Sequence, residues 1–531
     1  MATILTNKFK VRNAKAFMEL FRTNHVYMFI GRNRAWPKVD NVEVTDTPSN
    51  LTALSDELDV WNDIIAMQKV SISDVSLVIP RYDWVNTTSY TEYEHDKTDL
   101  FSRDGDPTNP FYVVKQEYSG MYTVWKVVAN VQNVASTSAP TWANGLSATH
   151  FRDNITTDGY LWKYMYRISS ADMSKFATTS IDSTGNKWMP VKNITTAGVQ
   201  QDINSQWDVQ RQAVHGGVHF IRPAAAIVSG DVNKKVRLDG DGSDFDSTIR
   251  LVGSTYYVDI DDPGKNYTYV RRVMKETGVS TSIYAEDTNL TAMLSPINGH
   301  GFDPVEEFGG YRLMIHTEFS GSTLFGQQGT TYEHTYADGT NTDFRTVGLI
   351  IDPIKSTSSH DDILNGEQKG TIVVTGDRQS AVDSTNLVKV NYTSITTASP
   401  LTTATDWIEK EVMQLKGSTS VAAGAPVDMH AIGRVVDIDH SGPTGDVFIQ
   451  PYAGQESLTK FSNSSSYYIF LVDSGETHGV DTSNYIVPGD TGGVVQNDLI
   501  PYTGDVVFLD NRVAITRYSD RTETIRLVIE F

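Results

Sequence analysis

The stretch Val26–Trp36, VYMFIGRNRAW, is the clearest sign of how this chain folds. Five apolar residues in a row run into Gly31, and Arg32 and Arg34 follow on either side of an asparagine. A half-buried strand would alternate apolar with polar residues, whereas Val26–Ile30 leave no face for water. The stretch therefore predicts a strand of an inner sheet that is covered on both faces.

Three further stretches, widely separated in sequence, are candidates for the layers around such a sheet. They are ISDVSLVIPRYDW at 72–84, DGYLWKYMYRI at 158–168 and TETIRLVIEF at 522–531. In the last of these, large apolar residues occupy every second position: Ile525, Leu527, Ile529 and Phe531. Such alternation predicts a strand with one buried face. We expect this strand to close a core that began at Val26.

The composition describes a chain that can bury a large core and would ordinarily form several domains. Of its 531 residues, 39% are hydrophobic. The net charge of -21 argues against a sequence-independent grip on nucleic acid, because such binding depends on Lys and Arg that neutralise phosphates. An acidic surface instead favours solubility and partners with basic patches.

The chain contains no cysteine, which excludes a disulfide framework, a thiolate nucleophile and cysteine-ligated metal sites. Its first residues, MATILTNKFKVRNAK, hold no apolar segment long enough for a secretory signal. No stretch approaches the run of about 18 apolar residues that a membrane-spanning helix needs. We therefore expect a protein that is made and kept in a cytoplasm, without a membrane partner.

Six motifs, in a fixed order and anchored near both ends of the chain, resemble one protein family. They are TNKFKVRNAKAFME, VYMFIGRNRAWP, VIPRYDW, DGYLWKYMYRI, FRTVGLIIDPI and LDNRVAITRYSDRTETIRLVIEF. In order and spacing they resemble the baseplate wedge protein called gene product eight in T-even-like contractile-tailed phages. The resemblance covers the first two hundred residues, a patch at 295–355 and the last twenty-five residues.

This resemblance implies a structural virion component of the tail baseplate, assembled in the host cytoplasm. It also implies a homodimer that joins neighbouring wedge proteins and is built around a multilayer β-sandwich. The homodimer and these partners follow from the family and not from the periodicity of the sequence.

The remaining pattern fits a mainly β fold with a few short α-helices. Apolar residues recur at helical spacing in Val11–Arg22 and again in Ser49–Met67, which predicts two amphipathic helices. After Ile72 the sequence turns to short β-rich runs separated by Gly, Asn, Asp, Pro and Thr. We predict a multilayer β-sandwich core with an inserted small β domain.

Changes of composition suggest the domain limits. We predict a main β-sandwich wedge domain at 1–355, with a long loop excursion at 85–154 that holds a hairpin. In 356–500 Ser, Thr, Gly and Asp dominate and strand-like runs are short, which favours an inserted antiparallel sandwich or barrel. The segment 501–531 is predicted to return to the main domain as its C-terminal strand.

An aromatic stripe in the stretch 158–168 permits two interpretations. Its members alternate along the strand: Tyr160, Trp162, Tyr164, Tyr166 and Ile168. Exposed aromatic rings bind sugars, and buried ones form cores. Because the alternation is strict and no acidic pair lies nearby, the core interpretation is favoured.

Two loops resemble metal sites. The run 238–246, LDGDGSDFD, looks like a calcium loop, but Asp244 stands where an EF-hand has an invariant glycine and Arg250 where it has a bidentate glutamate. In 298–307, His300 and Asp303 lie close to two glutamates, but no second histidine lies nearby and the glycines on either side of His300 signal tight turns. A hairpin and a tight turn are the favoured interpretations, and no metal is predicted.

No catalytic motif is present: the chain has no phosphate-binding P-loop, no HExxH, no GxSxG and no dinucleotide-binding glycine fingerprint. The charged residues that stand out are Arg32, Arg34, Arg81 and Asp83, each at a strand end within a family motif. Arg and Asp pairs at such places more often fix how loops and layers meet than perform chemistry. We predict no enzyme, no catalytic residues and no cofactor.

Two functions from different classes remain open at this point. The first is a structural component of the phage baseplate wedge that joins neighbouring wedge proteins. The second is a receptor- or carbohydrate-binding β protein of a phage tail, suggested by 25 tyrosines and 9 tryptophans. The second requires solvent-exposed aromatics beside acid pairs, and the aromatics of this chain mostly fall in strands that are expected to be buried. We favour the first.

Overall fold

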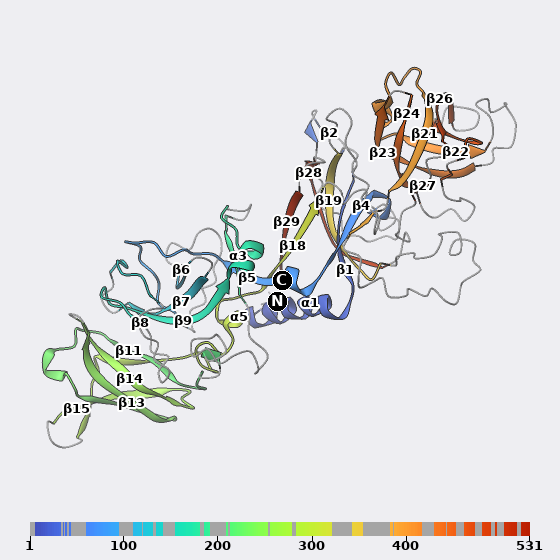
Figure 1. Cartoon of the computed structure of the whole chain (residues 1–531). Coiled ribbons are helices and arrows are strands. Elements are labelled where there is room, and N and C mark those ends of the chain that lie inside the picture. The colour runs from blue at the N-terminus through green and yellow to red at the C-terminus, as the bar shows by residue number, and fades with distance from the viewer. Residues whose placement is uncertain are drawn as a thin grey trace, which may run out of the picture. The chain divides into compact units, whose positions relative to one another are not determined.

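The structure is a computed structural model, shown in Figure 1. The described residues are 6–32, 36, 38–39, 42–43, 60–94, 110–118, 121–130, 134–141, 154–180, 185–191, 209–210, 213–252, 255–278, 283–320, 342–353, 383–385, 387–416, 429–441, 443–452, 461–462, 464–472, 480–489, 494–495, 504–517 and 522–531. Contacts divide the chain into two compact units. Unit 1 holds Met1–Met18, Val75–Ile315 and Leu527–Phe531, and unit 2 holds Glu19–Asp74 and His316–Arg526.

The first sheet of unit 2 is built around the strand predicted from VYMFIG. It has the order β20 (Asp383–Thr385), β4 (Ile64–Val70), β1 (Val26–Gly31), β19 (Thr342–Ile351) and β28 (Asp505–Arg517). All its pairings are antiparallel. Every residue of β1 is buried, so the prediction of an inner strand covered on both faces is confirmed. Aromatic rings of β1 pack with Trp61 and Ile64 in the core of this sheet.

The predicted helix at Ser49–Met67 is wrong at its C-terminal end. Residues 60–63 are helical, but the chain then enters β4 at Ile64. Four consecutive apolar residues begin β4, and all are buried between β1 and β20. Pairing with β1, and with β20 at Ala66 and Met67, engages the backbone of β4, so tertiary context overrides the helical spacing. Residues 44–59 lie outside the described part of the chain.

The second sheet of unit 2 is a small barrel. Its strands are β21 (Val388–Thr396), β22 (Glu411–Lys416), β23 (Met429–Ser441), β24 (Thr444–Pro451), β25 (Tyr467–Val472) and β26 (Val480–Pro488), with β27 (Val494–Val495) beside β21. The order is β24-β23-β22-β25-β26-β21, and β24 also pairs with β21. This extra pairing closes the ring, which removes the exposed edges of a sheet.

The barrel has a hydrophobic core of its own. It contains Trp407, from the 3-10 helix η5 (Ala404–Trp407), among inward residues of the surrounding strands such as Val390 and Ile449. The structure therefore has the barrel that was one of the two predicted forms of the insert. The predicted limits of 356–500 stay a prediction, because the described residues within them begin at Asp383.

The C-terminal strand lies in a four-stranded sheet, and residues 75–80, 188–190, 312–315 and 527–530 of this sheet belong to unit 1. The order of the sheet is β10 (Trp188–Pro190), β5 (Val75–Pro80), β18 (Arg312–Ser320) and β29 (Thr522–Glu530). Leu527 is buried, whereas Ile525, Ile529 and Phe531 are half-buried. Val528, on the other face, packs against Trp188 and its neighbours. The predicted strand is confirmed, with apolar contacts on both of its faces.

A second sheet of unit 1 contains the hairpin predicted within 85–154. It has the order β6 (Tyr112–Tyr118), β7 (Met121–Asn130), β9 (Tyr160–Ser169) and β8 (Asn154–Ile155), as Figure 1 shows. The strands β6 and β7 form the hairpin, and β7 pairs with β9 over most of its length. Part of the predicted loop excursion therefore belongs to a regular sheet, which we call the hairpin sheet.

The rest of unit 1 is a β module that we call the ladder module. It contains β11 (Val218–Pro223) paired with β17 (Leu290–Leu294), and a sheet in the order β14 (Thr255–Lys265), β13 (Ser243–Val252), β12 (Lys235–Gly240), β15 (Val270–Glu276) and β16 (Tyr284–Glu286). Apolar residues of both sheets share one core around Val236 and Ile249.

Short elements complete the described chain. They are the helices α1 (Asn7–Thr23), α3 (Ser170–Phe176) and α5 (Pro304–Glu307), the 3-10 helices η1 (Ile72–Asp74) and η2 (Ser229–Asp231), and the strand pair β2 (Lys38–Val39) and β3 (Val42–Glu43). The helix α1 contains the predicted Val11–Arg22. A mainly β fold with several sheets and few helices, as predicted, is confirmed.

Candidate functional site

Arg32, the first charged residue singled out from the sequence, turns the chain at the end of β1. It has a positive φ of 56°. Its backbone N–H donates to the Asp63 carbonyl at 2.7 Å, and its guanidinium pairs with the Asp63 carboxylate at 3.0 Å. The guanidinium also lies 3.9 Å from the centre of the Trp36 ring. Arg32 therefore fixes a turn beside β4, while Arg34 lies outside the described residues.

Asp63 also contacts a second arginine, from the barrel. Arg434 on β23 lies 3.5 Å from the other carboxylate oxygen of Asp63 and donates to the Tyr452 hydroxyl at 2.6 Å. Gln450 on β24 donates at 2.5 Å to the carbonyl of Ile64. The side chains of Asp63, Arg434 and Gln450 are buried. The cluster links the β1 sheet to the barrel within unit 2. Its charged groups therefore have a structural role.

Arg81 and Asp83 form a pair two residues apart. The Arg81 guanidinium donates to the Asp83 carboxylate at 2.8 Å, and about half of the Asp83 side chain is exposed. The backbone of Arg81 donates to the Lys187 carbonyl, and Asp83 forms a bridge to Val114. The pair therefore lies where β5 leads into the hairpin sheet, and it orders that connection.

The aromatic stripe on β9 is core. Tyr160, Trp162, Tyr164 and Tyr166 are at most 3% exposed, and the first three pack around Trp125. Burial raises the pKa of Tyr166 well above the usual tyrosine value. Rings that solvent cannot reach cannot stack on a sugar, so the core interpretation of this stripe is confirmed.

The calcium-like run 238–246 is the hairpin connection between β12 and β13. Asp239 accepts from Arg271 and Arg272, each at 2.7 Å. Asp241 accepts from the Thr268 hydroxyl and backbone N–H, which hold the pKa of this carboxyl at about 2. The hairpin interpretation is confirmed. The carboxylates bind donors from the β14–β15 connection and from β15.

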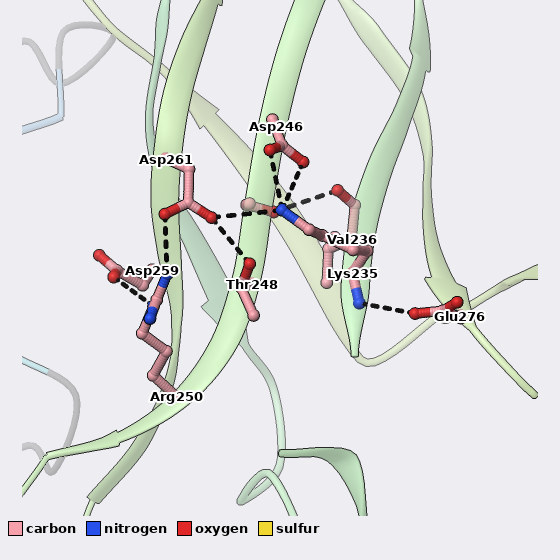
Figure 2. Close-up of polar contacts among 9 residues, drawn as sticks. Lys235, Val236, Asp246, Thr248, Arg250, Asp259, Asp261 and Glu276 are labelled. Carbon is pink, nitrogen blue, oxygen red and sulfur yellow. Dashed lines mark hydrogen bonds and ion pairs between the residues drawn. The ribbon is translucent and has the colours of Figure 1, made fainter. Parts of the chain in front are cut away.

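The outer face of the ladder module carries rows of alternating charge (Figure 2). Lys235 lies 2.8 Å from Asp246, and Asp261 accepts from Thr248 at 2.7 Å and from Arg250 at 2.9 Å. Burial alone would raise the pKa of Asp261, but these hydrogen bonds outweigh it and lower the pKa. In Figure 2, Lys235 and Arg250 face carboxylates on other strands, whereas the Glu276 carboxylate accepts from the backbone N–H of Lys235. Such a face stabilises strand pairing by cross-strand contacts.

The turn at 298–307 contains a buried charged cluster that the local sequence did not predict. His300 Nδ1 and the Glu307 carboxylate both accept from the ammonium of Lys126 on β7. The His219 ring, on β11, lies 4.7 Å from the His300 ring. The expectation that no second histidine lies nearby is therefore wrong, because β11 reaches this turn through its pairing with β17. One signal was available: Lys126 interrupts the apolar run of β7.

The other acidic residue of this turn, Asp303, has a different task. It caps α5 by accepting from the Glu306 backbone N–H at 3.0 Å, and it pairs with Lys15 of α1 at 2.7 Å. Among the described residues, no group of three or more His, Asp or Glu side chains is arranged to hold a metal ion. The turn therefore connects α5 to α1. The absence of a metal stays a prediction.

Comparison with known proteins bears on the first part of the chain. Residues 3–145 match the family model described as Bacteriophage T4, Gp8. This range contains the first three of the six motifs and confirms the resemblance. No curated protein matches the chain. Within the described ranges, no helix has the length and apolar character needed to cross a bilayer.

Proposed function

Because residues 3–145 belong to the family of Bacteriophage T4, Gp8, we propose that this chain joins neighbouring proteins of the baseplate wedge through protein–protein contacts. The family is one of structural baseplate proteins, so the chain has a structural role in the wedge and a place in the tail baseplate of the virion. It associates with other baseplate proteins. The joining contacts and a homodimeric state are our proposal.

The family match is the observation that carries this proposal. The way the described residues use their charges supports it: Asp63 links two sheets, Lys126 links a strand to a turn, and Lys235 links neighbouring strands. A protein that holds partners in one arrangement needs a rigid fold, and ion pairs between its strands and sheets contribute to that rigidity. The net charge of -21 leaves an acidic surface for partners with basic patches.

We also propose that the chain is not an enzyme. The residues singled out from the sequence, Arg32, Arg81 and Asp83, are engaged in pairs at strand ends. The perturbed tyrosines Tyr93, Tyr112 and Tyr166 owe their raised pKa values chiefly to burial. None of these groups is arranged as a nucleophile with a base within hydrogen-bond reach.

The alternative, a receptor- or carbohydrate-binding tail protein, finds less support. It needs exposed aromatic rings beside carboxylates, and the stripe on β9 is buried. Among the described residues, the exposed aromatic rings include Tyr269, Phe302 and Phe9. A few exposed rings are ordinary for a protein of this size.

The proposal can be tested by co-expression with the neighbouring wedge proteins of the same phage, followed by size-exclusion chromatography with light scattering. We expect the chain alone to elute at twice its mass of 58.8 kDa and to form a larger complex with a wedge partner. A glycan array run in parallel tests the alternative. A monomer that binds no wedge protein but retains glycans would overturn the proposal.

A further inference from the structure

The hairpin sheet and the ladder module of unit 1 meet in a joint made of apolar and charged contacts. Apolar residues of β7 and β9 pack with Phe220 of β11, and Met293 of β17 lies against them. Beside them, Arg222 of β11 pairs with Glu94 at 2.8 Å and also with Glu92. The joint therefore depends partly on charged groups, whose interactions change with protonation.

At this joint, His300 accepts a hydrogen bond that only its neutral form can accept. Its Nδ1 lies within hydrogen-bond distance of the Lys126 ammonium, which can only donate. Nδ1 must therefore be unprotonated and the imidazole neutral. Lys126 is fully buried and His300 is 7% exposed, so water screens their interaction weakly.

Charged and titratable groups of several elements face His300. Among the described residues they include the Lys126 ammonium from β7, the Glu307 carboxylate from α5, the His219 imidazole from β11 and the Tyr93 phenol from the segment before β6. With both histidines neutral, the charges of Lys126 and Glu307 cancel. The Lys126 ammonium also lies 4.3 Å from the centre of the Tyr93 ring, a contact that favours its charged form.

A proton on His300 would disturb this balance. The ring would lose the acceptor that holds Lys126, and two positive charges would face each other in a buried site. Glu307 lies 3.7 Å from His300 Nδ1, but one of its oxygens is engaged by Lys126 and the other by the Gly301 backbone N–H. Shared between two cations, this carboxylate compensates each of them less well than it compensates Lys126 alone.

We propose that His300 makes this joint acid-sensitive: its protonation separates β7 from the turn before α5 and loosens the hairpin sheet from the ladder module. The ordinary pKa of histidine is about 6.5, so lowering the pH from 8 to 5.5 favours protonation of an imidazole. The opening is an internal property of unit 1 and does not depend on the proposed assembly role.

The test is amide hydrogen exchange of the full chain between pH 8 and pH 5.5, corrected for the intrinsic pH dependence of exchange. We expect the opening of peptides from β7, β11 and α5 to rise below about pH 6.5, by up to tenfold per pH unit for one proton. Peptides from β22 and β25 of the barrel serve as an internal reference and should show no such rise.

His300→Asn is the decisive variant, because its amide oxygen takes the place of Nδ1 as an acceptor but binds no proton in this range. We expect it to keep the protection at pH 8 and to lose the rise in acid. The matched controls His219→Asn and His440→Asn should keep the rise; His440 lies in the barrel, where it pairs with the Tyr392 hydroxyl at 2.8 Å.

Three results would overturn the inference. They are a flat pH profile for the unchanged chain, an unchanged rise in His300→Asn, and loss of the rise in His219→Asn. If His300→Asn were unfolded at pH 8, His300→Gln would replace it under the same criteria.

Discussion

At the scale of single residues, Asp63 connects the β1 sheet to the barrel of unit 2. One of its oxygens faces Arg32 at the end of β1, and the other faces Arg434 on the barrel. A lone buried charge is costly, whereas a carboxylate between two guanidiniums is compensated. Arg32 and Arg434 therefore share the Asp63 carboxylate as a partner.

Replacing Asp63 with alanine should therefore be severe. The variant leaves the buried Arg434 and the half-buried Arg32 without this carboxylate, and we expect it to lower the free energy of unfolding by about 3 to 5 kcal/mol. Urea denaturation of the full chain measures this loss. Asp83→Ala is the matched control: its side chain is 47% exposed, so losing its pair with Arg81 should change stability by about 0 to 1 kcal/mol. Equal losses in both variants would contradict the account of Asp63.

Gly348 lies in the middle of β19, at a position where the β1 sheet has no room for a side chain. A Cβ there would lie 2.2 Å from the Phe29 ring and 2.7 Å from the Phe508 carbonyl oxygen. The carbonyl belongs to the neighbouring strand β28, so neither contact can relax without moving a strand or a buried ring.

We expect Gly348→Ala to destabilise the protein by about 1 to 3 kcal/mol, the usual range for an overfilled core. The midpoint of thermal unfolding reports the change. Gly230→Ala is the comparison, because a Cβ at Gly230 meets nothing within 4 Å. A Gly348→Ala protein that melts with the parent would show that Phe29 has room to move.

At the scale of elements, the lowered pKa of Asp241 should make the β12–β13 hairpin sensitive to acid. The Thr268 hydroxyl, then the Thr268 backbone N–H, lower the pKa of this carboxyl to about 2, against an ordinary value near 4. A lowered folded-state pKa stabilises the fold above the unfolded value, and the stabilisation is lost as pH falls through the folded value. This contribution should therefore fade between about pH 4 and pH 2.

Thr268→Val tests this contribution, because it removes the hydroxyl donor and keeps the backbone donor. We expect the stability of the variant to fall less steeply than that of the parent as pH drops from 5 to 2.5. Urea denaturation at several pH values measures the slope. Parallel curves for the two proteins would mean that Asp241 does not carry the effect.

The barrel is the element most able to fold by itself. Its ring of strands is closed, and its core packs around Trp407. We therefore expect the segment 356–500, expressed alone, to give a cooperative β-type melt by circular dichroism. It should melt below the full chain, because Arg434 then lacks Asp63 and Gln450 lacks the Ile64 carbonyl. A random-coil spectrum would mean that the barrel needs the β1 sheet to form.

At the scale of the whole molecule, unit 1 is held together by strands from distant parts of the sequence. Residues 527–531 belong to it, although residues 316–526 before them do not. The Phe531 ring lies 5.3 Å from that of Phe17 on α1, and Glu530 pairs with Arg312 of β18 at 2.9 Å. Unit 1 therefore brings residues 530 and 531 into contact with α1 and β18.

Deleting Thr524–Phe531 should yield insoluble protein or an uncooperative melt, and no incorporation into wedges. One buried and several half-buried apolar side chains contribute about 4 to 8 kcal/mol, compared with about 5 to 15 kcal/mol for the net stability of a domain. Solubility and calorimetry measure the result, with the exposed Arg526→Ala as control. A soluble truncated protein that melts at the parent temperature and enters baseplates would refute the assignment.

The sequence by itself determined the strands whose signal is local. The unbroken apolar run of β1, the alternation along β9 and β29, and the hairpin of β6 and β7 were all readable, because burial on one or both faces imposes a period on the chain. The same motifs indicated the family, and the match to residues 3–145 agrees. The predicted limits of 1–355, 356–500 and 501–531 stay a prediction.

Only the tertiary structure decided the contacts between distant residues. Helical spacing predicted a helix through Met67, and pairing with β1 and β20 made its end a strand. No local pattern placed His219 beside His300, or Arg434 beside Asp63, because strands hundreds or tens of positions apart meet through sheet pairing. The physical reason is that periodicity records which face of an element is buried, whereas the partner on that face depends on the path of the whole chain.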